Sequence, residues 1–264
     1  MYNFNYHQAK SVDDAAKLVS GVEEGKLMAG GMTLIPTLKQ RLAKPSDVVD
    51  LGKIADLKGI KKDGNTVVIG AMTRHFDVAN SDVVKSAIPA LAYLASHIGD
   101  PAVRNRGTMG GSVANNDPAA DYPAAVVALN ATITTNKRKI AADDFFKGLF
   151  ETALEPGEII TSFSYPLVDK AAYMKFPNPA SRYAIVGVFV AKSGNNVRVA
   201  VTGAGSVVFR QKDYEAALTK SFTPDAIKGI AQKQDNLNSD IHASAEYRAH
   251  LVNVMARRAV AAAG

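Results

Sequence analysis

The sequence contains no cysteine among its 264 residues. Without a thiol, the chain cannot form a disulfide, a thiolate zinc site or an ordinary iron-sulfur cluster, and it cannot attach a flavin through sulfur. An iron-sulfur centre that works with this chain must therefore sit on another polypeptide. Histidine is sparse too: the five residues, His75 among them, are scattered without an H-E-x-x-H pair. We interpret them as ordinary surface or half-buried residues and predict no metal site.

Long apolar runs are also absent. No segment approaches the roughly 20 apolar residues of a membrane-spanning helix, and residues 1–7 lack the basic-then-apolar layout of a secretory signal. With 47% hydrophobic residues, the chain can still bury a substantial core, and its length allows two or three compact units. We expect a soluble, cytoplasmic protein with no membrane span.

The net charge of +6 does not predict nucleic-acid binding, because the basic residues are dispersed. The tight basic groups are Lys61-Lys62, Lys137-Arg138-Lys139 and Arg257-Arg258, and no aromatic residues interleave them for base stacking. We interpret these groups as solvated faces. The basic balance could equally help to dock an acidic partner subunit or attract an anionic electron acceptor.

Helix and strand signals alternate along the first half of the chain. Ser11 followed by Asp13 and Asp14 is typical of a capped helix. Hydrophobic patterning predicts strands at 27–29, 48–51 and 66–71, and helices at 33–42 and 86–98. The next segment, 99–123, is poor in bulky apolar residues and rich in Gly, Asn, Asp and Pro, so we expect a long functional loop there.

The second half continues with a small-residue helix at 123–129 and strands at 131–135 and 159–165. Proline, lysine and tyrosine then interrupt the pattern over 168–179, which indicates a domain boundary. The same patterning predicts strands at 185–190 and 197–201, and helices that begin at Thr223 and at Ser244.

Two glycine pairs, Gly30-Gly31 and Gly110-Gly111, are candidates for ligand binding. Adjacent glycines accept positive φ angles, and their successive N–H groups can form a concave nest that holds phosphate oxygens. Two such nests could clasp one pyrophosphate, with hydroxyl donors supplied by Thr33, Thr108 and Ser112. Two ordinary tight turns explain the same residues equally well.

Asp121 follows the second pair. A carboxylate would repel a phosphate at close range, so in a shared site it would more readily accept hydrogen bonds from ribose or ribityl hydroxyls.

Other nucleotide and hydrolase motifs fail. The chain has no G-x-x-x-x-G-K-[ST] loop and no G-x-S-x-G elbow. Gly203-Ala204-Gly205 follows a predicted strand, but Val208 stands where a dinucleotide fingerprint needs a small residue for close helix packing. We interpret this glycine segment as a turn.

Both glycine segments resemble the FAD loops of a known family. Ala29-Gly30-Gly31-x-Thr33-Leu34-x-Pro36, and the segment 98–121 with Arg104-Asn105-Arg106-Gly107-Thr108-x-Gly110-Gly111-Ser112, are similar to the flavoprotein (medium) subunit of carbon monoxide dehydrogenase and to the FAD domain of xanthine dehydrogenase. Nearly the whole chain agrees with this pattern, including Gly70-Ala71-Met72-Thr73, Glu158-Ile159-Ile160, Tyr173-x-Lys175-Phe176 and 240–248.

The resemblance implies an α+β fold. A two-part FAD-binding domain of the vanillyl-alcohol-oxidase (PCMH) type would occupy residues 1–168, with subdomains of about 1–55 and 56–168. A small α/β C-terminal domain of the carbon monoxide dehydrogenase flavoprotein type, with a three-stranded sheet, would occupy residues 169–264.

The resemblance also implies non-covalent FAD and assigns its contacts. The pyrophosphate would lie against the two loops, and Asp121 would bind the sugar-alcohol hydroxyls. Ile98 and Gly99 would neighbour the flavin, which Lys175, Ile160 and Tyr183 would approach from the C-terminal side. The loop residues are Leu27, Met28, Ala29, Gly30, Gly31, Met32, Thr33 and Leu34, and Thr108, Met109, Gly110, Gly111 and Ser112. We assign no hydrogen bond to the side chain of Met32, since relatives often carry a polar residue there.

The chemistry of the family implies two partner subunits. A large subunit would hold the molybdenum cofactor and hydroxylate the substrate, and a small subunit would relay electrons through two 2Fe-2S clusters. FAD on this chain would accept single electrons and release pairs to an acceptor, in a dimer of heterotrimers. No catalytic residue is then expected here, which agrees with the lack of a convincing pair of catalytic carboxylates in the sequence.

Two alternatives stay open. The chain could be a self-contained FAD-dependent oxidase or reductase, although the region after the flavin domain is small. It could also be an assembly subunit that has lost its flavin, although intact glycine pairs argue against that loss.

Overall fold

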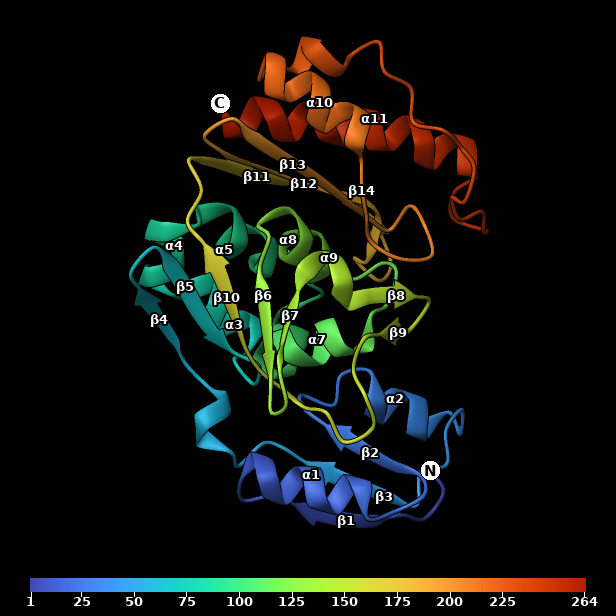
Figure 1. The fold of residues 1–264 in the computed structure, drawn as a ribbon. Helices are drawn as coiled ribbons and strands as arrows, with labels where there is room; N and C mark the ends of the chain where they lie inside the picture. Colours follow the sequence, from blue (N-terminus) through green and yellow to red (C-terminus); the bar gives the residue numbers. More distant parts are fainter.

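Three units follow one another along the chain, and the computed structural model describes all of them, residues 1–264 (Figure 1). The first is a small parallel sheet of order β1-β3-β2 with two helices: β1 (Asn5–Gln8), α1 (Val12–Ser20), β2 (Gly25–Met28), α2 (Leu34–Lys39) and β3 (Asp47–Asp50). As the sequence predicts, α1 begins after Ser11, whose side chain accepts a hydrogen bond from the backbone N–H of Asp14. The parallel strands end at one edge, where the loop after β2 begins.

The second unit is an antiparallel sheet covered by short helices. Its five strands, in the order β4-β5-β10-β6-β7, are β4 (Ile60–Asp63), β5 (Thr66–Gly70), β10 (Ile160–Pro166), β6 (Thr132–Thr135) and β7 (Lys139–Ala141). A short 3-10 turn (Ala55–Leu57) precedes the sheet. The other elements are α3 (His75–Asn80), α4 (Asp82–Ala87), α5 (Pro89–Ser96), α6 (Pro101–Arg106), α7 (Met109–Asn115), α8 (Tyr122–Ala128), α9 (Ala142–Phe145), β8 (Phe146–Gly148) and β9 (Glu151–Thr152).

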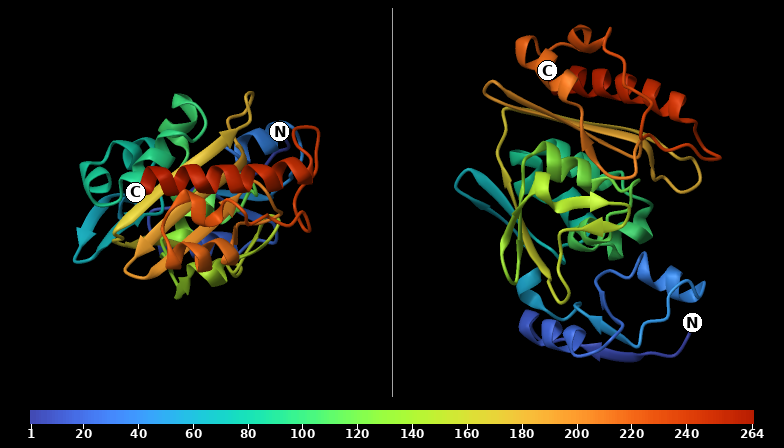
Figure 2. Two further views of the ribbon diagram at one scale, coloured as in Figure 1. Left: turned by 90° about the horizontal axis from the view of Figure 1, so that it is seen from above. Right: turned by 45° about the vertical axis from the view of Figure 1, so that its right-hand side comes forward.

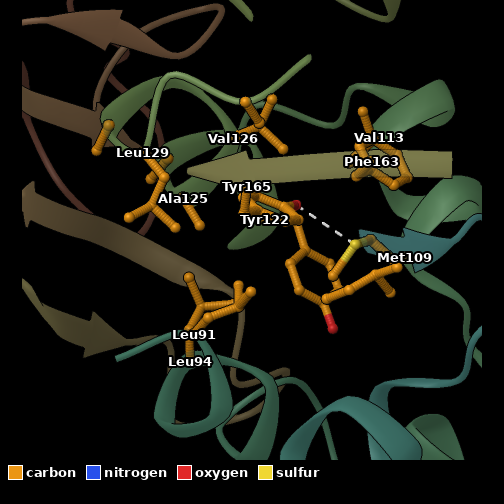
Figure 3. Close-up of a cluster of buried hydrophobic side chains, with 14 of the residues drawn as sticks. Leu91, Leu94, Met109, Val113, Tyr122, Ala125, Val126, Leu129, Phe163 and Tyr165 are labelled. Carbon is orange, nitrogen blue, oxygen red and sulfur yellow. Dashed lines mark hydrogen bonds between the residues drawn. The ribbon is translucent and has the colours of Figure 1, made fainter. Parts of the chain in front are cut away.

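The main core lies between this sheet and α8 (Figure 3). Every residue of α8 is buried, because its alanines and valines pack between β10, α5 and the third unit. Phe163 and Tyr165 of β10 lie in the same cluster, and the Tyr165 hydroxyl donates to Met109 Sδ at 3.3 Å. Met109 at the start of α7 is thereby anchored in the core.

The third unit is an antiparallel sheet of order β11-β12-β13-β14, with strands β11 (Lys170–Pro177), β12 (Ala184–Ser193), β13 (Asn196–Thr202) and β14 (Phe209–Arg210). Helices α10 (Lys212–Lys220) and α11 (Ala245–Ala263) cover the face that points away from the second unit, with a 3-10 turn (Pro224–Ile227) between them. The opposite face packs on α8. The third sheet therefore lies between the C-terminal helices and the second unit, at the other end of the molecule from the first unit (Figure 2).

Several sequence-based predictions agree with these elements, and others were wrong. The strands around the 194–195 turn, the turn at Gly203 and the start of α11 after Ser244 are confirmed. The helix predicted at 86–98 is interrupted at Ile88, because Pro89 begins a new helix. The helix predicted from Thr223 is a single 3-10 turn.

Segment 99–123, predicted as a loop, is largely helical. Asp100 caps α6 by accepting from the N–H of Val103, and Thr108 caps α7 by accepting from the N–H of Gly111. The helical pattern was invisible because both helices are short, α6 buries none of its residues and α7 buries only Met109, Gly110 and Val113. These caps explain how a glycine-rich stretch is ordered.

Segment 168–179, predicted as a boundary, contains the whole of β11, the first strand of the third unit. Its Lys175 and Tyr173 broke the apolar pattern, yet the Tyr173 side chain is buried and the Lys175 ammonium has partners inside the protein. The third sheet also has one strand more than predicted, the two-residue β14. None of the helices combines the length and apolar character that a bilayer crossing requires.

Glu158 joins the loop before β10 to the turn between β6 and β7. Its buried carboxylate accepts hydrogen bonds from Arg138 Nε and Nη2, both at 3.0 Å, from Thr135 Oγ1 at 2.7 Å and from the Glu155 N–H at 2.9 Å. The Arg138 guanidinium is the largest of the causes that lower the pKa of Glu158 from 4.5 to about 2. The folded state thus favours the ionised carboxylate.

Replacing Glu158 by Gln should lower the free energy of unfolding at pH 7 by on the order of 2–3 kcal/mol. A carboxylate whose pKa is lowered by folding stabilises the protein above its ordinary value, and this stabilisation is lost as the pH falls toward about 2. The difference between the two proteins in urea unfolding should therefore shrink below about pH 4.5. Glu155→Gln, at a side chain that is 56% exposed, is the control and should change stability by less than about 0.5 kcal/mol. A Glu158→Gln deficit that is equal at pH 7 and pH 3 would contradict this account.

Candidate cofactor site

A cavity of about 640 Å³ lies where the three units meet. Its wall is formed by the loop after β2, the segment from α6 through α7, residues 117–121, the start of β10 and residues 181–183. Segments far apart in the sequence thus share one enclosed space. Cavities of this size are typical of sites for small molecules and cofactors.

The first glycine loop presents unpaired backbone donors to this cavity. The six consecutive N–H groups from Ala29 to Leu34 donate to no protein acceptor, although these residues line the cavity. Gly31 has φ +75°, a left-handed conformation that glycine adopts without strain. Gly30 packs directly against the backbone of Arg106 and Gly107, where a Cβ would collide with the Arg106 carbonyl oxygen. A run of free amides around a glycine turn is suited to an anionic ligand.

The second glycine pair differs from the sequence-based expectation, because its amides are already paired. Met109 N donates to Thr73 O at 3.0 Å and Gly110 N to Ala71 O at 2.8 Å, while Gly111 N donates to Thr108 Oγ1 at 3.1 Å. These glycines instead allow close approach. A Cβ on Gly111 would lie 3.2 Å from the Ala29 Cβ, so the two loops touch. At this loop, the hydroxyls of Thr108 and Ser112 remain as candidate donors.

Asp121 lines the cavity from the side of the third unit. Its Oδ1 accepts from Tyr173 OH at 2.5 Å and pairs with Lys175 Nζ at 2.9 Å, whereas Oδ2 has no protein partner. Burial raises the pKa of Asp121, although Lys175 and Tyr173 act in the opposite direction. Because Oδ2 has no protein partner, it is free to accept a hydrogen bond from a ligand.

Most residues predicted for the site lie together in the cavity wall: Leu27, Ala29, Gly30, Gly31, Met32, Thr33, Leu34, Ile98, Gly99, Thr108, Gly110, Gly111, Ser112, Asp121, Ile160 and Tyr183. Three do not line it. The side chain of Met109 is in the core, Met28 packs beside Gly31, and Lys175 contacts Asp121 rather than the cavity.

His75 lines the cavity and was missed. Our interpretation of the histidines as surface or half-buried residues was wrong for His75, whose residue surface is only 4% exposed. Burial, and the nearby Arg104 charge to a lesser degree, lower its pKa to about 4, so the ring is neutral at pH 7. It packs on Tyr122, with ring centroids 5.3 Å apart, and against Gly107. Only its place after Gly70-Ala71-Met72-Thr73 could have indicated it from the sequence.

Two family models match the chain. Residues 2–168 match "FAD binding domain in molybdopterin dehydrogenase", and residues 171–263 match "CO dehydrogenase flavoprotein C-terminal domain". The chain belongs to the FAD-binding medium subunits of the molybdenum hydroxylase family.

Relatives of this medium subunit agree along their full length. The glyceraldehyde dehydrogenase medium chain of Sulfolobus acidocaldarius is 37% identical, over 97% of this chain and 96% of that one. The carbon monoxide dehydrogenase medium chain of Hydrogenophaga pseudoflava is 35% identical, over 98% of this chain and 96% of that one. The structure of reconstituted CO dehydrogenase from Oligotropha carboxidovorans superposes with a TM-score of 0.92 at 34% identity, over 99% and 97%. The expected fold is therefore confirmed.

The residues of this medium subunit fit FAD. A pyrophosphate needs several N–H donors and tolerates no carboxylate beside it, and the Ala29–Leu34 loop supplies such donors without a competing side-chain charge. A sugar alcohol needs acceptors, and Asp121 Oδ2 is one. Without cysteine, a cysteinyl link is excluded.

Replacing Gly110 by Ala should push the second loop away from Ala71, whose carbonyl accepts from the Gly110 N–H. The new Cβ would meet Ala71 Cβ at 2.6 Å and Ala71 O at 2.8 Å, and backbone cannot move aside cheaply. We expect a loss of about 1–3 kcal/mol in urea unfolding, as for other overpacked sites, together with weaker FAD retention on gel filtration. Gly229→Ala is the matched control, because nothing lies within 4 Å of its Cβ position. A Gly110→Ala protein as stable and as yellow as the control would show that this contact is unimportant.

Proposed function

We propose that this medium subunit is the FAD-carrying electron-transfer subunit of a molybdenum hydroxylase complex, which passes electrons from the 2Fe-2S clusters of a partner subunit to an external acceptor. When bound, FAD supplies the exchange between one-electron and two-electron transfer. The observation that carries the proposal is the run of free amides at 29–34, facing a cavity that all three units enclose. The protein supplies binding and orientation.

Each part of the cavity wall has a proposed task. The amides of the first loop and the hydroxyls of Thr108 and Ser112 would hold the pyrophosphate, and Asp121 would accept from the sugar-alcohol chain. Ile98, Gly99, Ile160 and Tyr183 would adjoin the flavin ring; they line the cavity from the second and third units. We assign no acid-base catalyst and no metal to this chain.

The partners in this proposal are a large molybdenum-cofactor subunit and a small 2Fe-2S subunit, assembled as a dimer of heterotrimers. The absence of cysteine supports it, because the clusters must then lie on another chain. The relatives of this chain include a nicotine 6-hydroxylase medium subunit, and a medium subunit belongs to a multi-subunit enzyme. The division at residues 168 and 169 is likewise proposed, and the change from β10 to β11 supports it. A cytoplasmic location stays a prediction from the sequence.

Purification of the chain from its native host tests the proposal. The expected product is a complex that contains molybdenum, iron and FAD, with about one FAD for each copy of this chain. In stopped flow, the flavin absorbance of the isolated subunit should fall, as FAD is reduced, when the reduced 2Fe-2S subunit is added. The same absorbance should fall much more slowly when the substrate of the complex is added alone. A yellow monomer that turns over its own substrate would favour a self-contained oxidase instead. A correctly folded chain that ignores added FAD would favour an assembly role.

A further inference from the structure

Lys175 lies where three segments of the cavity wall meet. Its Nζ is 2.9 Å from Asp121 Oδ1, and it donates to His97 O at 2.8 Å and to Arg182 O at 3.0 Å. An ammonium group has three N–H donors, and all three have acceptors within the protein. The side chain is only 7% exposed. Lys175 therefore has no donor left for a ligand, so its effect on the cavity must pass through the groups it holds.

The third unit also fixes the segment that carries Asp121. Thr202 Oγ1 donates to Ala120 O at 2.6 Å and to Pro118 O at 3.0 Å, and Gly203 N donates to Pro118 O at 2.7 Å. Together with Tyr173 OH on Asp121, these bonds attach residues 118–121 to β11 and to the end of β13. The position of Asp121 thus depends on contacts from outside its own unit.

We propose that Lys175, assisted by Tyr173, is a positioning residue that holds the Asp121 carboxyl group through Oδ1, so that its free Oδ2 accepts a hydrogen bond from a polyol hydroxyl in the cavity. The inference rests on the proposed function, because that polyol is the sugar-alcohol chain of FAD. It replaces the direct contact between Lys175 and the flavin that the family resemblance implies. The C-terminal unit would then control cofactor affinity through one carboxylate.

The electrostatic surroundings of Asp121 explain why the ammonium matters. The ionisable groups that face Asp121 come from several segments. They are Lys175 and Tyr173 on β11, His97 after α5, Tyr122 next to Asp121 in the chain, and Tyr183 before β12. Burial alone disfavours a charged carboxylate and raises the pKa of Asp121, whereas the Lys175 charge is the largest influence that lowers it. Without Lys175, the pKa of Asp121 should rise further, and the protonated carboxyl is a weaker acceptor than the carboxylate.

The test is the dissociation constant for FAD, measured by flavin fluorescence between about pH 6 and pH 9, for the wild-type chain and for Lys175→Met. The variant should bind about tenfold more weakly at the acidic end, since hydrogen bonds to charged groups are stronger by roughly that factor. Binding should recover as the pH rises and Asp121 ionises. The wild-type dissociation constant should vary much less over this range.

Asp121→Asn separates this effect from simple misfolding. In the Asp121→Asn background, the further change Lys175→Met should add no pH dependence, because residue 121 can no longer ionise. Lys170→Met, at an exposed lysine on the same strand, is the matched control and should bind FAD like the wild type.

The outcomes distinguish the two proposals. A wild-type chain that does not bind FAD would overturn the proposed function. A wild-type chain that binds, with a Lys175→Met variant whose weakening is absent or equal at every pH, would overturn only the role of Lys175. If Lys175→Met does not fold, Tyr173→Phe replaces it, because this change removes one donor to Asp121 Oδ1. It should shift the pH dependence in the same direction by a smaller amount, and an unchanged profile would refute the inference.

Discussion

The site depends on the close contact between the loop after β2 and the α6–α7 segment. Gly30 lies against the backbone of Arg106 and Gly107, and Gly111 lies against Ala29. Side chains at these points would hold the loops apart, as the missing space for a Cβ shows. The N–H groups of the second loop donate to acceptors within the protein, so this loop is held in place. The N–H groups of the first loop have no protein acceptor. Amides without a protein acceptor are available to a ligand, so such a run in the cavity wall favours a bound anionic acceptor.

The cavity is closed by a second set of contacts, from the C-terminal unit. Thr202 and Gly203 donate to the carbonyl oxygens of Pro118 and Ala120. Lys175 joins Asp121 to the carbonyls of His97 and Arg182. These bonds connect segments from two units around one carboxylate. The small third unit therefore has a function beyond covering the core, because it completes the wall against which a cofactor is held.

The sequence predicted the residues that line the cavity better than it predicted the elements around them. The two glycine pairs and Asp121 were recognisable because glycine doublets and a family pattern leave local signals. The helices α6 and α7 were missed, since both are short, bury few residues and begin at the caps of Asp100 and Thr108. The pairing of the Gly110 amide with Ala71 and the burial of His75 are tertiary effects that no local pattern reports. Lys175 was expected beside the flavin, whereas in the structure its Nζ contacts three oxygens from distant segments.

Amide hydrogen exchange measured by mass spectrometry, with and without FAD, tests the central claim most directly. Free amides exchange quickly, and hydrogen-bonded ones exchange slowly. The account predicts that FAD strongly protects the peptide that covers residues 29–34, and that the amides of residues 109–111 are protected before FAD is added. Fast exchange at 109–111 that FAD abolishes, with no change at 29–34, would contradict the account.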